Sequence, residues 1–320
     1  MIKHKFLAVT SLVFGFILIV ILGASIYMMA ISLVPSNNRG RNYTKAYTRL
    51  FTRYPHVKAW VDSLQSAGAI RDTFIMGQDG DRHHALMIAA PQRSNSIAVV
   101  VHGYTDCAVD YLNLARIYHQ GMGFNVILPD LHACGKSEGK AHQMGWLDRL
   151  DVLQWINIAD SLWRDSTKQS RIVVHGVSMG AATTMCVAGE TTIPAVKCFV
   201  EDCGYTSVWD EFSSEMKKQF GLPEFPLLYT TSALSKLKYD WSFGEASPLE
   251  QVKKCRKPML FIHGGKDDYV PTRMVYPLYE AKPAPKELIV FHNTAHAESY
   301  KDYPLEYERI IKRFVSRYFK

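Results

Sequence analysis

The hydrophobic pattern begins with a long apolar run at the N-terminus. Residues 6–34 contain 29 positions without a charge and are rich in Ile, Leu, Val and Phe. About 20 such residues span a bilayer as a helix, so residues 1–35 are predicted to form a transmembrane anchor. A cleaved signal peptide has a shorter apolar region of roughly 7–15 residues, and Gly23-Ala24-Ser25 is the one plausible cleavage site. We therefore expect a retained, single-pass anchor.

The next segment, residues 36–67, is predicted to be a basic, amphipathic helical connector. Apolar side chains recur at helical spacing between Asn42 and Ser66, and Pro55 interrupts the pattern. Such a segment either lies on the membrane or packs on the domain that follows, and the spacing alone allows both.

Short apolar strands then alternate with amphipathic helices over residues 68–320. Strands are expected at 70–76, 83–89, 96–103, 125–129, in the run that leads to Ser178, and at 195–202, 259–263 and 287–291. Helices are expected at 111–120, 145–164, directly after Ser178, and at 303–318. This alternation predicts an α/β domain with a mostly parallel central sheet and helices on both faces. The alternation of strands and helices is interrupted at about 204–250, where many aromatic residues predict an inserted helical cap.

The net charge of +7 argues for a membrane surface and against nucleic acid. Residues 1–61 hold eight Lys or Arg and no acid, which leaves 29 basic against 30 acidic residues in the remainder. The excess therefore borders the anchor, where it suits anionic lipid headgroups, and no basic patch remains for DNA or RNA. Basic residues flank both ends of the apolar run, so the side of the membrane stays open.

Cysteine spacing gives no sign of a metal site or a disulfide framework. Six cysteines occur without a C-x-x-C pair, so free, buried thiols are expected (Cys107, Cys134, Cys186, Cys198, Cys203 and Cys255). Neither a zinc-binding helix motif nor a P-loop or dinucleotide fingerprint is present, and no cofactor is expected.

Polar motifs gather where predicted strands end. Gly176-Val-Ser178-Met-Gly180 is a G-x-S-x-G motif between a strand and a helix, the context of a nucleophile elbow. His102-Gly103 ends an earlier strand, residues 263–270 read HGGKDDYV, and His292 and His296 follow the last strand. In an open α/β sheet, sites form at these carboxyl ends. A serine becomes nucleophilic when a histidine, itself oriented by an acid, takes its proton.

These ordered motifs resemble the α/β-hydrolase superfamily, in the branch of lid-bearing bacterial esterases, lipases and serine aminopeptidase-like enzymes. The resemblance covers about residues 70–320 and includes residues 130–139, similar to D-x-R-G-x-G-x-S-x-G. The chain departs from that pattern at His132-Ala133, where the family has Arg-Gly.

The resemblance implies a role for each site residue. Ser178 is the expected nucleophile, Asp267 the acid and His296 the base, and the backbone amides of Tyr104 and Met179 form the oxyanion hole. Asp202 is the alternative acid. Asp268 is expected to be a solvated neighbour and His292 a strand-end residue, while His102, His175 and His263 are expected to be structural.

The predicted activity is hydrolysis of a small-molecule carboxylic ester or related acyl substrate through an acyl-enzyme. A peptidase or amidase of the same fold is an alternative, and so is a non-catalytic receptor or scaffold. The natural substrate and the oligomeric state do not follow from the sequence, because the pocket depends on the cap.

Overall fold

One mixed sheet forms the centre of the domain. The computed structural model describes residues 2–35, 41–165 and 169–319. Within these residues the strand order is β1-β2-β4-β3-β5-β6-β7-β8, and only the pairs β1/β2 and β2/β4 are antiparallel. The strands are β1 (Ile70–Met76), β2 (Arg82–Ile88), β3 (Ser96–Val101), β4 (Asn125–Pro129), β5 (Arg171–Val177), β6 (Val196–Asp202), β7 (Met259–Gly264) and β8 (Lys286–Phe291). The predicted strands are confirmed to within two residues at either end.

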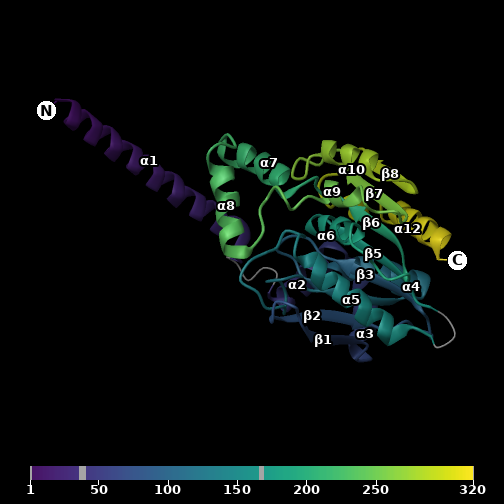
Figure 1. Cartoon of the computed structure of the whole chain (residues 1–320). Helices are drawn as coiled ribbons and strands as arrows, with labels where there is room; N and C mark the ends of the chain where they lie inside the picture. Colours follow the sequence, from purple (N-terminus) through teal and green to yellow (C-terminus); the bar gives the residue numbers. More distant parts are fainter. Residues whose placement is uncertain (1, 36–40, 166–168, 320) are drawn as a thin grey trace.

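Helices cover both faces of the sheet (Figure 1). In β3, Ile97, Val99 and Val101 belong to one buried apolar cluster, whereas Ala98 and Val100 belong to the other. This follows from the two-residue period of a strand, and it explains why β3 is apolar throughout. The first cluster packs under α5 (Asp148–Trp163), α6 (Met179–Ala188), α9 (Pro248–Val252) and α10 (Val275–Ala281). The second packs under α4 (Leu112–Met122) and α12 (Pro304–Tyr318), with α11 (Ser299–Asp302) nearby.

Two predicted helices differ from the structure in their first turn. The helix expected at 145–164 begins at Asp148, because Gly145 adopts a positive φ of 80°. The helix expected at 111–120 is α4, and a short 3₁₀ turn, η2 (Ala108–Tyr111), directly precedes it. A further 3₁₀ turn, η3 (Thr272–Met274), precedes α10. All six cysteines are buried and free, as expected.

The connector packs on the domain, which decides between its two predicted positions. It consists of α2 (Tyr43–Arg53), the 3₁₀ turn η1 (Pro55–Val57) and α3 (Lys58–Ser66). Its apolar face buries Ala46, Leu50, Val57 and Val61 in the second cluster. The break falls at Pro55, since proline cannot continue the preceding helix.

The N-terminal helix α1 (Ile2–Leu33) projects from the domain (Figure 1). Residues 9–33 are long and apolar enough to cross a membrane. Along its first part the apolar side chains are exposed, but Ser25, Met29 and Leu33 are buried. The last turns of α1 therefore pack on the domain, chiefly against α8 of the cap.

The insertion between β6 and β7 confirms the predicted helical cap. Its main helices are α7 (Val208–Phe220) and α8 (Leu227–Tyr239), which lie beside the sheet where α1 reaches the domain (Figure 1). Aromatic side chains hold the cap together and fix it to the core: Trp241 and Phe243 are fully buried, and Phe212 packs edge-on against Phe243. Part of the aromatic content of this segment therefore serves to pack the cap.

Candidate active site

Ser178 occupies a strained turn between β5 and α6. Its φ is +57°, a left-handed conformation that is uncommon for a residue with a side chain. A Cβ atom at Gly176 would lie 2.0 Å from the carbonyl oxygen of Gly180, and one at Gly180 would lie 2.1 Å from that of Val101. Both glycines are thus required for strand and helix to meet so closely, and the turn holds Ser178 above the end of β5.

Ser178, His296 and Asp267 form one chain of hydrogen bonds. His296 Nε2 lies 2.8 Å from Ser178 Oγ, and His296 Nδ1 lies 2.7 Å from Asp267 Oδ2. Because the carboxylate accepts at Nδ1, the histidine carries its proton there, and Nε2 is left to accept from the serine hydroxyl. The structure therefore brings together three side chains from turns after β5, β7 and β8, separated by up to 118 residues.

Asp267 is held as a carboxylate. Its Oδ1 accepts hydrogen bonds of 3.0 Å from the backbone amides of Tyr269 and Val270. Burial alone would raise its pKa, but the hydrogen bonds of His263 and His296 hold the pKa below the usual value for aspartate. His263 Nε2 lies 3.3 Å from Asp267 Oδ2, so this histidine supports the acid.

The alternative residues lie elsewhere. Asp202 is buried and accepts a hydrogen bond of 2.9 Å from the Tyr307 hydroxyl, and burial raises its pKa to about 6. The side chain of Asp268 is 83% exposed and pairs with Lys218, and His292 is exposed. Of the two predicted acids, the one that is bonded to His296 and kept ionised by its surroundings is Asp267.

The residues predicted for the oxyanion hole flank Ser178. Met179 is the first residue of α6, so its amide is one of the unpaired donors at a helix start. Tyr104 lines the same pocket as Ser178, and a Cβ atom at Gly103 would lie 3.5 Å from Ser178 Cβ. His102 supports this loop: its Nε2 accepts from the Leu131 amide at 2.9 Å, and its Nδ1 lies 2.8 Å from the Gly103 carbonyl oxygen.

The family motif at residues 130–139 has a structural role here. Asp130 is buried, and its carboxylate accepts from the amides of Ala108 and Lys136 at 2.7 and 2.8 Å. Ala133, which stands where the family has glycine, adopts a φ of +62°. The backbone therefore keeps the left-handed conformation that glycine favours, although the residue has changed.

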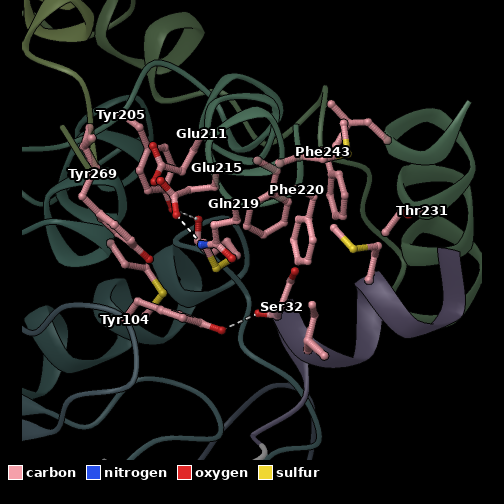
Figure 2. Close-up of a pocket in the computed structure, with 18 of the residues that line it drawn as sticks. Ser32, Tyr104, Tyr205, Glu211, Glu215, Gln219, Phe220, Thr231, Phe243 and Tyr269 are labelled. Carbon is pink, nitrogen blue, oxygen red and sulfur yellow. Dashed lines mark hydrogen bonds between the residues drawn. The ribbon is translucent and has the colours of Figure 1, made fainter. Parts of the chain in front are cut away.

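Ser178 lines a pocket whose wall also includes residues of the cap helices α7 and α8. Figure 2 shows this pocket. Its wall is mainly apolar, with Met144, Met179, Phe212, Met216, Phe220, Leu228, Phe243, Tyr269 and Val270. Glu211, Glu215 and Gln219 of α7 form a polar side, and Gln219 Nε2 donates to Glu215 at 2.6 Å. Burial, with a smaller contribution from Glu215, raises the pKa of Glu211 well above its usual value.

The N-terminal helix also lines this pocket, which sequence reasoning missed. Met28, Ile31 and Ser32 contribute to the wall, and the Tyr104 hydroxyl donates to the Ser32 carbonyl at 2.7 Å (Figure 2). The backbone amide of His142 also donates to the Leu33 carbonyl at 2.8 Å. An apolar helix gives no sequence signal for such a contact, because its membrane-spanning and pocket-lining residues are equally hydrophobic.

Two groups among the described residues place three metal-ligand side chains close together. One consists of Cys203, Asp267 and His296, and thus shares two members with the hydrogen-bonded chain. The other consists of Asp79 in the β1–β2 turn, His83 in β2 and His132 in the loop after β4.

Comparison with known proteins agrees with the fold. Residues 116–320 match the prolyl oligopeptidase family. The chain is 30% identical over 227 residues to the uncharacterized protein YqkD of Bacillus subtilis, covering 71% of this chain and 73% of that protein. The esterase Pf2001 of Pyrococcus furiosus superposes with a TM-score of 0.64 at 23% identity, covering 80% of this chain and 96% of that one. The acylaminoacyl peptidase of Pyrococcus horikoshii gives a TM-score of 0.59 at 18% identity, covering 78% of this chain and 42% of that one.

Proposed function

From the premise that this chain belongs to the prolyl oligopeptidase family and is a serine hydrolase of the α/β fold, we propose that it cleaves a carboxylic ester or related acyl substrate. Ser178 is the nucleophile, His296 the general base and Asp267 the orienting acid. The observation that carries the proposal is the unbroken chain from Asp267 through His296 to Ser178 Oγ at the base of a mainly apolar pocket.

The chemistry follows from the direction of the hydrogen bonds. His296 Nε2 takes the hydroxyl proton as Ser178 Oγ attacks the substrate carbonyl carbon, and Asp267 stabilises the imidazolium that forms. The amides of Met179 and Tyr104 donate to the oxyanion of the tetrahedral intermediate. His296 then returns the proton to the departing alcohol, which leaves an acyl-Ser178 ester. A water molecule, deprotonated by the same histidine, hydrolyses that ester and restores the serine.

The pocket wall favours an apolar acyl group. Aliphatic and aromatic side chains of the cap, together with Met28 and Ile31 of α1, surround the space next to Ser178. Burying a hydrocarbon chain among them removes apolar surface from water, at about 25 cal/mol per Å². We therefore expect esters with medium acyl chains to be better substrates than acetate esters.

A peptidase or amidase activity is the second candidate, supported by Glu211 and Glu215. Two carboxyl groups at one side of the pocket suit a protonated amine, because an ammonium group would offset the unfavourable burial of their charge. A substrate with a free α-amino group beside the scissile carbonyl would then be selected.

A substrate panel tests the proposal and separates the two candidates. Purified full-length protein in detergent is assayed with nitrophenyl esters of two to twelve carbons, and with aminoacyl nitroanilides whose amines are free or blocked. Ester turnover that rises with chain length supports the acyl-ester proposal. If the enzyme prefers anilides with a free amine, and Glu215→Gln loses this preference, the result favours the peptidase candidate instead. Absence of turnover on every compound contradicts both, and favours the non-catalytic scaffold.

We also propose that α1 anchors the enzyme and places the pocket at the membrane surface. Most of the exposed apolar side chains of α1 lie in residues 6–20. As a helix these residues are only about 22 Å long, whereas the hydrocarbon core of a bilayer is about 30 Å thick. Some five more residues, to about Ser25, complete the span, and Ser25 bonds to Thr230 at the start of α8. Nearby Phe225 and Tyr229 are 74% and 53% exposed, as suits the interface. Amphiphilic substrates are thus expected to enter from the bilayer.

The anchor is tested by the mass of the protein recovered from washed membranes. An intact N-terminus, in protein that resists alkaline carbonate extraction, supports a retained span. A mature N-terminus near residue 25 indicates a cleaved signal peptide and contradicts the proposal, as does release by carbonate. The variant Phe225→Asp, which leaves α1 unchanged, controls for attachment through the cap alone and is expected to remain in the membrane fraction.

A further inference from the structure

A compact group of histidine and aspartate side chains lies outside the active site, where the β1–β2 turn meets the loop after β4. His83 Nε2 lies 3.1 Å from Asp79 Oδ1, and His132 Nδ1 lies 3.2 Å from Asp79 Oδ2. The donor atoms of these three residues all lie within 4.8 Å of one another. Two potential ligands that are close in sequence, Asp79 and His83, thus meet a third, His132, from a distant loop.

The remaining nitrogen of each histidine faces a further carboxylate. His83 Nδ1 lies 3.5 Å from Asp151 Oδ2 on α5, and His132 Nε2 lies 3.8 Å from Asp81 Oδ2. Metal-binding histidines are commonly oriented in this way, by a carboxylate on the nitrogen that does not bind the metal. His83 is fully buried, and its Nδ1 has no hydrogen-bond partner among the described residues.

Among the described residues, no lysine or arginine pairs with the aspartate side chains around His83 and His132. These aspartates are Asp79, Asp81 and Asp151, and within the described part of the chain the ionisable side chains that face them are His83 and His132. The carboxyl groups of Asp79 and Asp81 therefore meet no fixed positive charge among the described residues. His132 stands where the family motif has arginine, so the position that would supply such a charge has become a potential ligand.

Two glycines shape the space around these side chains. A Cβ atom at Gly77 would lie 2.4 Å from both Asp79 Oδ1 and His83 Nε2, and one at Gly139 would lie 2.5 Å from His132 Nε2. Gly139 also has a φ of +133°, which side chains rarely allow. The turn and the loop therefore close tightly on the histidines.

We propose that Asp79, His83 and His132 bind a divalent transition-metal cation, with zinc the best match. With metal–ligand distances of about 2.0–2.1 Å, the edge of a zinc tetrahedron is about 3.3 Å, close to the separations of Asp79 Oδ2 from His83 Nε2 (3.3 Å) and from His132 Nδ1 (3.2 Å). Two imidazoles favour zinc over calcium or magnesium, which prefer oxygen ligands. A water molecule occupies the fourth position, and the bound ion ties the β1–β2 turn to the loop after β4.

The test measures metal content, and the same measurement over a series of zinc concentrations gives the affinity. Full-length protein without a polyhistidine tag is stripped with chelator in detergent, dialysed against micromolar zinc with millimolar calcium, and analysed by elemental mass spectrometry. We expect one zinc per chain in the wild type and less than a tenth of an equivalent in His83→Gln and His132→Arg. Asp151→Asn is expected to weaken zinc binding roughly 10–100-fold by removing the carboxylate behind His83.

Two further variants distinguish this site from other histidines. His292→Gln alters an exposed histidine and is expected to retain the zinc. His296→Gln removes a member of the group Cys203, Asp267 and His296, and is also expected to retain it. Labelling of Ser178 by a fluorophosphonate, which does not depend on zinc, verifies that His83→Gln and His132→Arg are folded. Full zinc content in these two folded variants, no zinc in the wild type, or loss of zinc in His296→Gln would overturn the proposal.

Discussion

Replacing Ser178 with alanine is expected to lower kcat for ester hydrolysis by about 10⁶-fold, the scale on which loss of a serine nucleophile acts in other serine hydrolases. Without Oγ, no acyl-enzyme forms, although oxyanion donors and the pocket still bind substrate. The variant is therefore expected to keep a rate about 10³–10⁴ times that of the uncatalysed reaction in water. The measurement is the rate with the best ester of the panel, together with covalent labelling by a fluorophosphonate, which should disappear.

Ser161→Ala is the matched control for this substitution. Ser161 is exposed on α5, and its hydroxyl donates to the Asn157 carbonyl within the same helix. Its loss should leave both kcat and labelling unchanged. If Ser178→Ala still reacts with the fluorophosphonate, or keeps more than a hundredth of the rate, the nucleophile is another residue.

Asp267→Asn is expected to lower kcat by about 10⁴-fold. The amide group of asparagine can present N–H instead of an acceptor to His296 Nδ1, which favours the tautomer that cannot accept the serine proton. The asparagine carbonyl can still accept from the amides of Tyr269 and Val270, so the loop should remain in place. Steady-state kinetics and the thermal unfolding midpoint measure the two effects separately.

Asp202→Asn distinguishes the two possible acids. Asp202 makes its hydrogen bond to Tyr307, and its pKa near 6 reflects a site that disfavours the charged form. The substitution should change kcat by only a few-fold. A large loss in Asp202→Asn, combined with a small loss in Asp267→Asn, would reverse the assignment.

Much of the fold was predictable because its signals are local. Apolar runs of strand length separated by amphipathic helices predicted the parallel sheet, and Gly176 and Gly180 predicted the strained turn at Ser178. The boundary errors have local causes too. Gly145 delays the start of α5 through its positive φ, and α4 is preceded by a 3₁₀ turn that begins at Ala108. The open question about the connector was decided by packing, since its apolar face suited a membrane and a protein core equally.

The predicted site residues came from ordered motifs, and their catalytic roles stay predictions until the variants are measured. The structure adds which of them meet. It joins Asp267 to His296, keeps His292 in solvent and assigns His263 to the support of Asp267. Spacing along the chain could not separate neighbours such as Asp267 and Asp268, because one residue of difference in a turn decides whether a side chain points inward or outward.

By itself, the sequence determined the type of chain: a long apolar N-terminal helix, an α/β domain and a serine placed at a strand end. These depend on contacts between residues close in sequence, on periodicity and on glycine sterics. Only the tertiary structure decided that Met28 and Ile31 line the pocket and that Asp79, His83 and His132 converge. Such features arise when segments distant in sequence pack together, and their positions depend on the whole fold, which no local pattern encodes.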